Sequence, residues 1–188
     1  MDHLPSPSLC FLVFGLSELG LLLFKRAKGG TRGADHGSLR ALWLVIGASI
    51  YAAIDISFRW PRFAFPTNTG LHVLAFALFA GGLALRWWSI IHLGRFFTVN
   101  VAIAQDHRLV DDGPYRSLRH PSYTGALVTL LGLALMLGNW LSALVLLVPV
   151  TAMLLWRISI EEKALAAAFG PAYAAYQART KRLVPFVY

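Results

Sequence analysis

Polar residues concentrate in one stretch of the chain, 105–123, although the sequence on either side is strongly apolar. The stretch combines arginine, histidine and tyrosine with two turns, at Gly113-Pro114 and His120-Pro121. Proline fixes its own φ and disfavours the α conformation of the preceding residue, so an ordered loop with accessible backbone groups is expected. A helix beginning at Pro121 would add its positive N-terminal end, which together with the cationic side chains favours an anion such as a carboxylate. We therefore predict a polar binding pocket around this stretch.

A second polar cluster, Arg157, Glu161 and Glu162, follows the last apolar run. Arg157 and Glu161 are four residues apart, so they share one face of a helix. One interpretation is an ordinary surface salt bridge, which contributes roughly a few tenths of a kcal/mol. The other is a binding pair, in which Arg157 holds a substrate anion and Glu161 holds a cationic or amine group. Spacing alone leaves both open, and Glu162 is expected to face solvent.

The composition places these clusters in a membrane protein. Of the 188 residues, 57% are hydrophobic and 14% are charged, whereas an average soluble domain has about 25% charged residues. The mean hydropathy is +0.60, so part of the surface is expected to contact lipid. The length indicates a single membrane-embedded domain, 1–188, in which 1–91 supplies three spans and 92–188 forms the binding half.

Five apolar runs, at roughly 7–24, 39–58, 70–91, 122–138 and 141–156, predict an all-α, polytopic bundle of about five transmembrane helices. The last two runs are short and close together, which indicates a tight hairpin that is either spanning or partly re-entrant. A helix over 158–169 is expected next, then a break at Gly170-Pro171 and a short C-terminal cytoplasmic helix over 172–179. The first run lacks a preceding basic segment, so we expect it to be a retained span rather than a signal peptide.

The basic residues indicate the orientation. Lys and Arg number five in 25–40, four in 92–121 and five in 157–188, but only two in 59–69. Because cytoplasmic loops carry the excess of positive charge, we expect the N-terminus outside and both polar clusters at the cytoplasmic face of the inner membrane. This placement accounts for the net charge of +8 without a nucleic-acid partner.

Ionisable residues within the predicted spans need partners, because charges are costly in a bilayer. Glu18 and Arg86 lie at nearly the same depth when each is counted from the inner end of its span, so we hypothesise that they form a pair. The alternative is that Arg86 extends to the interface beside Trp87 and Trp88.

Other chemistries find little support in the sequence. It contains no His-Glu-x-x-His or paired CxxC motif, so no metal is predicted, and it contains no P-loop motif. Its one cysteine, Cys10, excludes an intrachain disulfide and a thiolate metal cluster. Asp111-Asp112 before Gly-Pro is interpreted as a turn, and His72 and His92 as structural residues.

The C-terminal half of the chain resembles the isoprenylcysteine carboxyl methyltransferase family, in particular its prokaryotic-type integral membrane members. The resemblance covers residues 94–186, whereas the first three spans match only in hydrophobic character. It rests on an ordered set of motifs: His107-Arg-Leu-Val110, Gly113-Pro-Tyr-Arg116, Arg119-His-Pro-Ser-Tyr-Thr-Gly125, Arg157-x-x-x-Glu161-Glu162-x-x-Leu165, Phe169-Gly170, Tyr173-x-x-Tyr176 and Leu183-Val-Pro185.

The resemblance implies an S-adenosylmethionine-dependent methyltransferase without a Rossmann domain, whose cofactor lies in a cytoplasm-facing pocket built by 105–123 and the flanking helices. By analogy, the cofactor contacts fall on Asn100, His107, Arg108, Leu109, Val110, Tyr115, His120, Pro121, Ser122, Tyr123 and Glu161. Asn100 stands where enzymes of the eukaryotic type carry a glutamine. Arg157 resembles the residue that faces the substrate carboxylate, and Arg119 is expected to help organise the same site; these two are the predicted catalytic residues.

The expected reaction is methylation of a carboxylate on an isoprenylcysteine-like compound, a lipophilic small molecule or prenylated substrate that enters from the bilayer lipids. A carboxylate is ionised at neutral pH and needs no general base, which suits an arginine that only orients it. Relatives of this fold also resemble enzymes for phospholipid amines and small thiols, whose deprotonation would need a base such as Glu161 or a tyrosine. A nicotinamide-dependent reductase and a non-enzymatic lipid-binding bundle are further alternatives.

Overall fold

The apolar runs of the sequence form the long helices of the molecule. The computed structural model describes residues 5–24, 37–97 and 108–184. Five apolar helices make up the bundle: α1 (Pro7–Phe24), α2 (Ser38–Arg59), α3 (Thr69–Leu93), α4 (Pro121–Met136) and α5 (Trp140–Phe169). Three short 3-10 helices, η1 (Pro61–Phe63), η2 (Gly94–Phe96) and η3 (Gly113–Arg116), and the C-terminal α6 (Pro171–Arg179) complete the element order. The prediction of an all-α helical bundle is confirmed.

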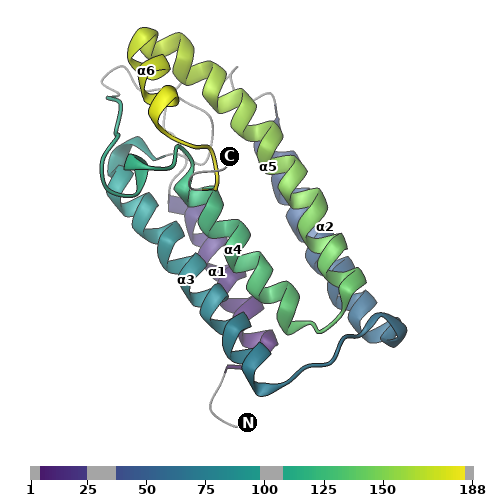
Figure 1. Cartoon of the computed structure of the whole chain (residues 1–188). Helices are drawn as coiled ribbons and strands as arrows, with labels where there is room; N and C mark the ends of the chain where they lie inside the picture. Colours follow the sequence, from purple (N-terminus) through teal and green to yellow (C-terminus); the bar gives the residue numbers. More distant parts are fainter. Residues whose placement is uncertain (1–4, 25–36, 98–107, 185–188) are drawn as a thin grey trace.

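The bundle consists of two antiparallel helix pairs. α3 lies along α4, with α1 beside them, and α2 lies along α5. The pairs are joined by the turn at 137–139 and separate from one another toward the end that carries α6 (Figure 1). The polar clusters of the sequence lie at this α6 end.

The narrow end of the bundle is closed by a small hydrogen-bonded joint. The Asn139 side chain caps α5 by accepting a bond from the Ser142 backbone N–H at 3.1 Å, and its amide donates to the Trp60 carbonyl at 3.0 Å. The Ser142 hydroxyl donates to the Ala53 carbonyl of α2 at 2.7 Å. The Ser142 backbone N–H belongs to the first turn of α5, where a helix offers it no acceptor of its own. The bonds to the Trp60 and Ala53 carbonyls fix where α2 meets α5.

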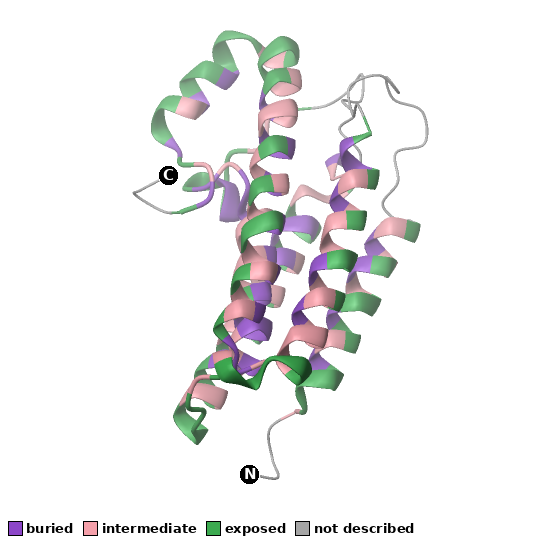
Figure 2. Ribbon diagram, turned by 90° about the vertical axis from the view of Figure 1, so that its right-hand side faces the viewer, coloured by how far each residue is buried: buried purple, intermediate pink, exposed green. Residues whose placement is uncertain are grey.

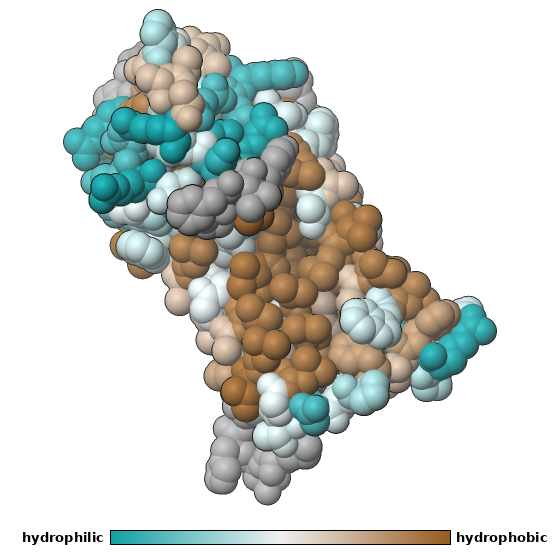
Figure 3. All heavy atoms as spheres, in the orientation of Figure 1, coloured by the Kyte–Doolittle hydropathy of each residue, from teal (hydrophilic) through white to brown (hydrophobic). Residues whose placement is uncertain are grey.

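Apolar side chains cover much of the outer surface of the helices. In Figure 2 the exposed residues follow the outward faces of the bundle, and Figure 3 shows a broad hydrophobic surface below a polar end. Leu16, Leu44, Phe58 and Ile91 are more than half exposed. An exposed apolar surface of this extent is typical of contact with a membrane. Three helices, α2, α3 (extended through η2) and α5, are long and apolar enough to cross one, and α1 and α4 are shorter apolar helices.

The helix bounds agree with the predicted hairpin, but they show that its second helix is longer than predicted. α4 and α5 are connected by a tight turn as predicted, but the apolar run at 141–156 and the helix expected over 158–169 form one continuous helix. Its 30 residues extend about 45 Å at 1.5 Å per residue, which is more than the ~30 Å of a hydrocarbon core. The break at Gly170 and the short helix after it are confirmed. The count of five spans and the orientation stay predictions.

Candidate functional site

The polar end of the bundle is built by wrapping the C-terminal segment around the start of α4. The Arg119 backbone N–H donates to the Lys181 carbonyl at 2.7 Å, and that of His120 donates to the Arg182 carbonyl at 3.1 Å. The Tyr176 hydroxyl of α6 donates to the Tyr115 carbonyl of η3 at 2.7 Å. α6 and the loop before α4 therefore form one ordered layer over the space between the helix pairs.

Glu162 is the centre of this layer, which corrects the expectation that it faces solvent. It is 5% exposed. Its carboxylate accepts hydrogen bonds from Arg119 Nε at 2.8 Å and from Arg182 Nε at 3.0 Å, and it lies 3.4 Å from His120 Nε2. The physical reason is that α6 and the C-terminal segment return over this face of α5 and cover it. Two arginines then compensate for the burial of the carboxylate.

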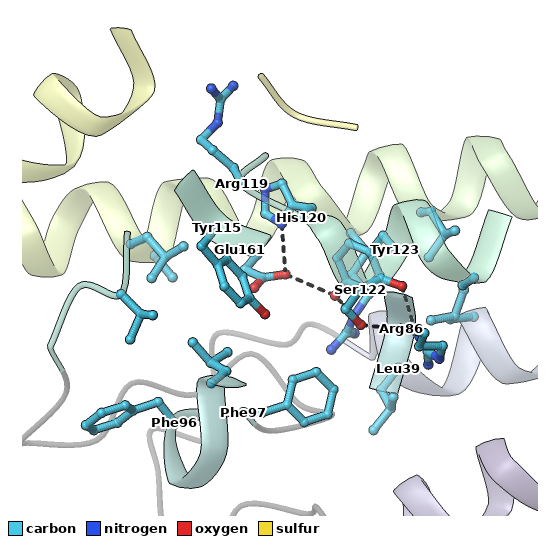
Figure 4. A pocket seen from close by; sticks show the side chains of 18 of the residues that line it. Leu39, Arg86, Phe96, Phe97, Tyr115, Arg119, His120, Ser122, Tyr123 and Glu161 are labelled. Atoms are coloured by element: carbon cyan, nitrogen blue, oxygen red, sulfur yellow. Dashed lines mark hydrogen bonds and ion pairs between the residues drawn. The ribbon is translucent and has the colours of Figure 1, made fainter. Parts of the chain in front are cut away.

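Beneath the layer lies a cavity that continues into the bundle; its empty space, including the open mouth, is about 1400 Å³. Both helix pairs and η3 contribute to its wall. Figure 4 shows Tyr115, His120, Tyr123 and Glu161 grouped in its polar part, with Phe96, Phe97 and Leu39 around them. The predicted site residues Arg108, Leu109, Val110, Tyr115, Arg119, His120, Ser122, Tyr123, Arg157 and Glu161 all line this one cavity.

Arg157 and Glu161 are connected through a tyrosine of α4. The Tyr123 hydroxyl accepts a hydrogen bond from Arg157 Nε at 3.1 Å and donates one to Glu161 Oε2 at 3.0 Å. Arg157 is 2% exposed and also donates to the Ser38 hydroxyl of α2 at 2.8 Å. A buried guanidinium held in this way has a fixed orientation, as a group that binds a carboxylate requires.

The pair hypothesised between Glu18 and Arg86 is confirmed and forms part of the cavity wall. Arg86 donates to both Glu18 carboxylate oxygens, from Nε at 2.5 Å and from Nη2 at 2.6 Å. Its Nη1 donates to the backbone carbonyl and hydroxyl of Ser122 at 3.1 and 3.2 Å. Arg86 therefore links α1, α3 and the first turn of α4. Trp87 instead donates its indole N–H to Ser17 at 2.8 Å, on the same α1–α3 contact.

His92 and Asp112 hold η3 against the end of α3. His92 Nε2 lies 2.7 Å from Asp112 Oδ1, and this hydrogen bond lowers the pKa of the Asp112 carboxyl below its ordinary value. Gly113, at φ 54°, leaves room for the His92 ring, which a Cβ would approach to 2.6 Å. Asp111 pairs with Arg179 of α6. The residues interpreted as a turn therefore do form one, and each of the two acids also fastens it to a neighbouring element.

The tyrosines of the layer are neutral hydrogen-bonding groups rather than bases. Burial raises the pKa of the Tyr115 phenol far above its ordinary value, and the Glu161 carboxylate raises it further. Burial likewise raises the pKa of Tyr173 and of Tyr176, and for Tyr173 the Glu162 and Glu161 carboxylates add to the effect. All three phenols remain protonated at neutral pH.

One predicted site residue, Pro121, does not line the cavity, and two others lie outside the described residues. Pro121 is fully buried at the start of α4, beside the cavity-lining Ser122. Asn100 and His107 lie outside the described residues. Arg119 lines the cavity, but it also donates to Glu162 and to the carbonyls of Gln177 and Thr180, so it holds the layer together.

Comparison with known proteins supplies the family. The sequence model of the isoprenylcysteine carboxyl methyltransferase (ICMT) family matches residues 73–167, just over half of the chain. Protein-S-isoprenylcysteine O-methyltransferase B of Arabidopsis thaliana is 35% identical over 137 residues, which cover 62% of this chain and 70% of the relative. The chain belongs to the ICMT family.

Further relatives agree with this assignment. Protein-S-isoprenylcysteine O-methyltransferase of Schizosaccharomyces pombe is 30% identical over 147 residues, covering 77% of this chain and 62% of the relative. The solved structure of a eukaryotic intramembrane Ras methyltransferase ICMT superposes with a TM-score of 0.61 at 26% identity, over 77% of this chain and 52% of that chain. The chain thus spans between about half and 70% of the length of these ICMT proteins.

Sequence reasoning missed several residues of the cavity. Leu39, Trp43, Phe96 and Phe97 line it, and none of them belongs to a motif that the sequence singles out. Trp43 and Leu39 lie on α2, in the part of the chain that precedes the family match. In the sequence, Leu39 and Trp43 show only a four-residue spacing on one helix, and residues that pack in an ordinary core have the same spacing.

Proposed function

We propose that this ICMT-family protein transfers a methyl group from S-adenosylmethionine to the carboxylate of a lipophilic, isoprenylcysteine-like acceptor at the cytoplasmic face of the membrane. The observation that carries the proposal is the order of side chains along α5. Val150 and Leu154 line the deep, apolar part of the cavity, Arg157 follows one turn later, and Glu161 lies in the polar part. Arg157 therefore lies where an amphiphile would have its carboxylate if its tail lay between the helix pairs.

The polar part of the cavity suits S-adenosylmethionine, which is zwitterionic, cationic at sulfur and partly aromatic. Arg108 and His120 are suited to its carboxylate, and Glu161 to its ammonium or sulfonium charge. Tyr173 is 1% exposed, and its hydroxyl has no hydrogen-bond partner among the described residues, although it lines the cavity. A buried hydroxyl without a partner is unusual in a folded protein and indicates a ligand group.

The chemistry of the site favours a carboxylate acceptor over an amine or a thiol. S-adenosylmethionine, when bound, supplies a methyl group already activated on a sulfonium, and its transfer to a carboxylate gives a methyl ester without a proton leaving the acceptor. An amine or thiol must lose a proton, yet Tyr115, Tyr173 and Tyr176 are held as neutral phenols. Glu161, the other base considered, is assigned in this proposal to the positive charge of the cofactor. Arg157 can orient an anion but cannot accept a proton. Positioning of two reactants is therefore the main task of the residues.

The acceptor site is the apolar part of the cavity. Its wall includes Phe14, Leu42, Ile46, Leu130, Val150 and Leu154. Burial of a hydrocarbon chain there is favourable by about 0.8 kcal/mol per CH₂ group. Membership in a family of membrane methyltransferases and the outward-facing apolar surface together support an acceptor that arrives from the lipid.

The test is a calorimetric titration of the detergent-purified protein with S-adenosylhomocysteine, the product form of the cofactor. We expect saturable binding by the wild type and at least tenfold weaker binding by Glu161→Ala and His120→Ala, about 1.4 kcal/mol or more. Asp55→Asn is the matched control, because Asp55 pairs with Arg59 at the opposite end of the bundle. Circular dichroism checks that each variant is folded. Absence of binding by folded wild type would refute the proposal, and tight binding of a nicotinamide dinucleotide would favour the reductase alternative.

A further inference from the structure

Arg157 is held by hydroxyl groups that come from both helix pairs. Its Nε donates to the Tyr123 hydroxyl of α4 at 3.1 Å, and its Nη1 donates to the Ser38 hydroxyl of α2 at 2.8 Å. The arginine itself belongs to α5, which lies along α2. One guanidinium thus links the α3–α4 pair to the α2–α5 pair, at the end of the bundle where the pairs separate (Figure 1).

The contact with Arg157 accounts for Ser38 better than helix capping does. A serine at the start of a helix is usually explained as the N-cap, whose hydroxyl accepts a bond from a backbone N–H. In α2, however, Gly37 occupies the N-cap position, and Ser38 follows it as the first helical residue. Ser38 is fully buried, and its hydroxyl accepts a bond from an arginine 119 residues later in the chain. The serine therefore serves a contact between distant segments.

A hydroxyl orients a cation without compensating its charge. Arg86, for comparison, donates to both carboxylate oxygens of Glu18, and that carboxylate compensates the positive charge of the guanidinium. The oxygen of Ser38 is neutral, so its bond to Arg157 fixes the guanidinium and leaves the charge in place. Such a bond suits an arginine whose task is to bind a carboxylate of another molecule.

We propose that Ser38 is a positioning residue for methyl transfer, because it holds the Arg157 guanidinium in the orientation that receives the acceptor carboxylate. This inference rests on the proposed function and adds a residue of α2 to it. Ser38 precedes the segment that the family model matches, 73–167, and it does not line the cavity. It therefore acts through Arg157. Misplacement of a catalytic group by about 1 Å can cost a hundredfold in rate, even when the altered residue is remote from the reaction.

The test compares two ligands that differ only at the carboxylate, N-acetyl-S-farnesylcysteine and its carboxamide. They are titrated into protein saturated with S-adenosylhomocysteine, which prevents turnover. We expect wild type to bind the carboxylate at least tenfold more tightly, since charge-assisted hydrogen bonds are the stronger ones. Ser38→Ala should reduce this preference to within about threefold, by weakening binding of the carboxylate alone. A purely structural role for Ser38 would instead weaken binding of both ligands alike.

Activity gives a second measurement of the same effect. With S-adenosylmethionine present, kcat/KM for N-acetyl-S-farnesylcysteine should fall by about tenfold in Ser38→Ala, on the scale of a hydrogen bond to a charged group. Affinity for S-adenosylhomocysteine should not change, because the altered contact lies on the acceptor side of the site.

Two further variants separate the hydroxyl from packing. Ser38→Cys keeps a side chain of similar size, but sulfur is a weak acceptor, so the preference should fall as it does in Ser38→Ala. Ser38→Cys also carries the test if Ser38→Ala does not fold. Ser49→Ala is the matched control, because Ser49 is likewise buried on α2 and does not line the cavity. Circular dichroism checks that each variant is folded.

The outcomes distinguish the role of Ser38 from the proposed function. An unchanged preference in the folded variants, or an equal loss for both ligands, would overturn the positioning role and leave the proposed function intact. A preference restored in Ser38→Cys would assign the effect of Ser38→Ala to packing and would likewise overturn it. Wild type that binds S-adenosylhomocysteine but does not distinguish the carboxylate from the carboxamide would refute the carboxylate acceptor, and with it the proposed function.

Discussion

Tyr123 connects Arg157 and Glu161, the two proposed functional residues of α5. Its hydroxyl lies between Arg157 and Glu161, accepting from one and donating to the other. Arg157 is proposed to orient the acceptor and Glu161 to contact the cofactor. The tyrosine therefore couples the two halves of the site without taking part in a proton transfer.

Removal of this hydroxyl should impair turnover more than it impairs folding. In Tyr123→Phe the Arg157 guanidinium loses an acceptor, and hydrogen bonds to charged groups contribute about 1.5–3 kcal/mol. We expect kcat/KM for the acceptor to fall by about ten- to a hundredfold, since each 1.4 kcal/mol is tenfold in rate. Tyr51→Phe, on the exposed face of α2, serves as the control. An unchanged kcat/KM would show that Arg157 is oriented without this residue.

Glu161 and Glu162 are neighbours with opposite roles, and their substitution should separate stability from binding. Glu162→Gln leaves the partly buried Arg119 with only a neutral partner at this position. It also removes the charge that pairs with Arg182 of the C-terminal segment. We expect a loss of about 3 kcal/mol in the free energy of unfolding, the scale for breaking a buried ion pair. Glu161→Gln should lower stability by less but weaken cofactor binding. Unfolding in detergent and calorimetry measure the two effects; similar stability of both variants would contradict this division.

At the residue scale, the sequence predicts the residues that line the cavity better than it predicts residues such as Glu162 that hold the covering layer in place. The cavity-lining residues from Arg108 to Tyr123 occur in consecutive motifs, so their proximity could be read from spacing and from the family resemblance. The error at Glu162 arose because adjacent helical residues point about 100° apart, and only the return of α6 decides which of those faces is covered. That return depends on contacts between segments distant in sequence.

At the scale of elements, small residues determine how closely α3 and α4 approach. A Cβ added to Gly82 would lie 2.4 Å from the Thr129 backbone nitrogen, and one added to Gly125 would lie 2.6 Å from the Arg86 backbone nitrogen. Gly132 meets the backbone of α3 in the same way, near Phe79. Glycines at such positions let helix backbones pack closely in membrane proteins, where apolar burial against lipid gives little net attraction.

Gly81 and Gly82 form a matched pair for testing this contact. Gly82→Ala forces α3 away from α4, and overpacking of this kind costs about 1–3 kcal/mol. Gly81→Ala makes the same chemical change where nothing lies within 4 Å of the added methyl group, so it should be neutral or slightly stabilising. Thermal unfolding of the two variants in one detergent compares them directly. Equal midpoints would mean that the helices can separate without loss.

Helix bounds and depth were the most predictable features at this scale. The apolar runs begin and end within about two residues of α1 to α4. Depth counting led to the hypothesis of a Glu18–Arg86 pair, which the structure contains. Depth works because the bilayer imposes one axis on every span and penalises an unpaired charge. Depth alone does not predict that Arg86 also donates to Ser122. That contact depends on how each helix is rotated about its axis, which packing determines.

At the scale of the whole molecule, the two ends of the protein differ in charge, and an apolar surface lies between them. The α6 end carries the cavity, its arginines and the C-terminal segment, and the hydrophobic surface lies below it (Figure 3). The opposite end carries Arg59 and Arg62 beside Trp60 and Phe63, the aromatic and basic pattern of a membrane interface. The excess of Lys and Arg in the sequence segments of the α6 end predicts that this end is cytoplasmic.

This orientation can be tested with single cysteines at the two ends. Native Cys10 is buried at 1% exposure and should stay unlabelled under native conditions. Lys163→Cys lies on an exposed face near the end of α5, and Arg62→Cys on exposed η1. With a membrane-impermeant maleimide, we expect Lys163→Cys to react only in inside-out bacterial vesicles and Arg62→Cys only in right-side-out vesicles. The reverse pattern would contradict the charge rule, and labelling of both in one vesicle type would contradict a spanning bundle. A cytoplasmic α6 end is also what the proposed reaction requires, because a polar, charged cofactor reaches the cavity from water while the acceptor reaches it from lipid.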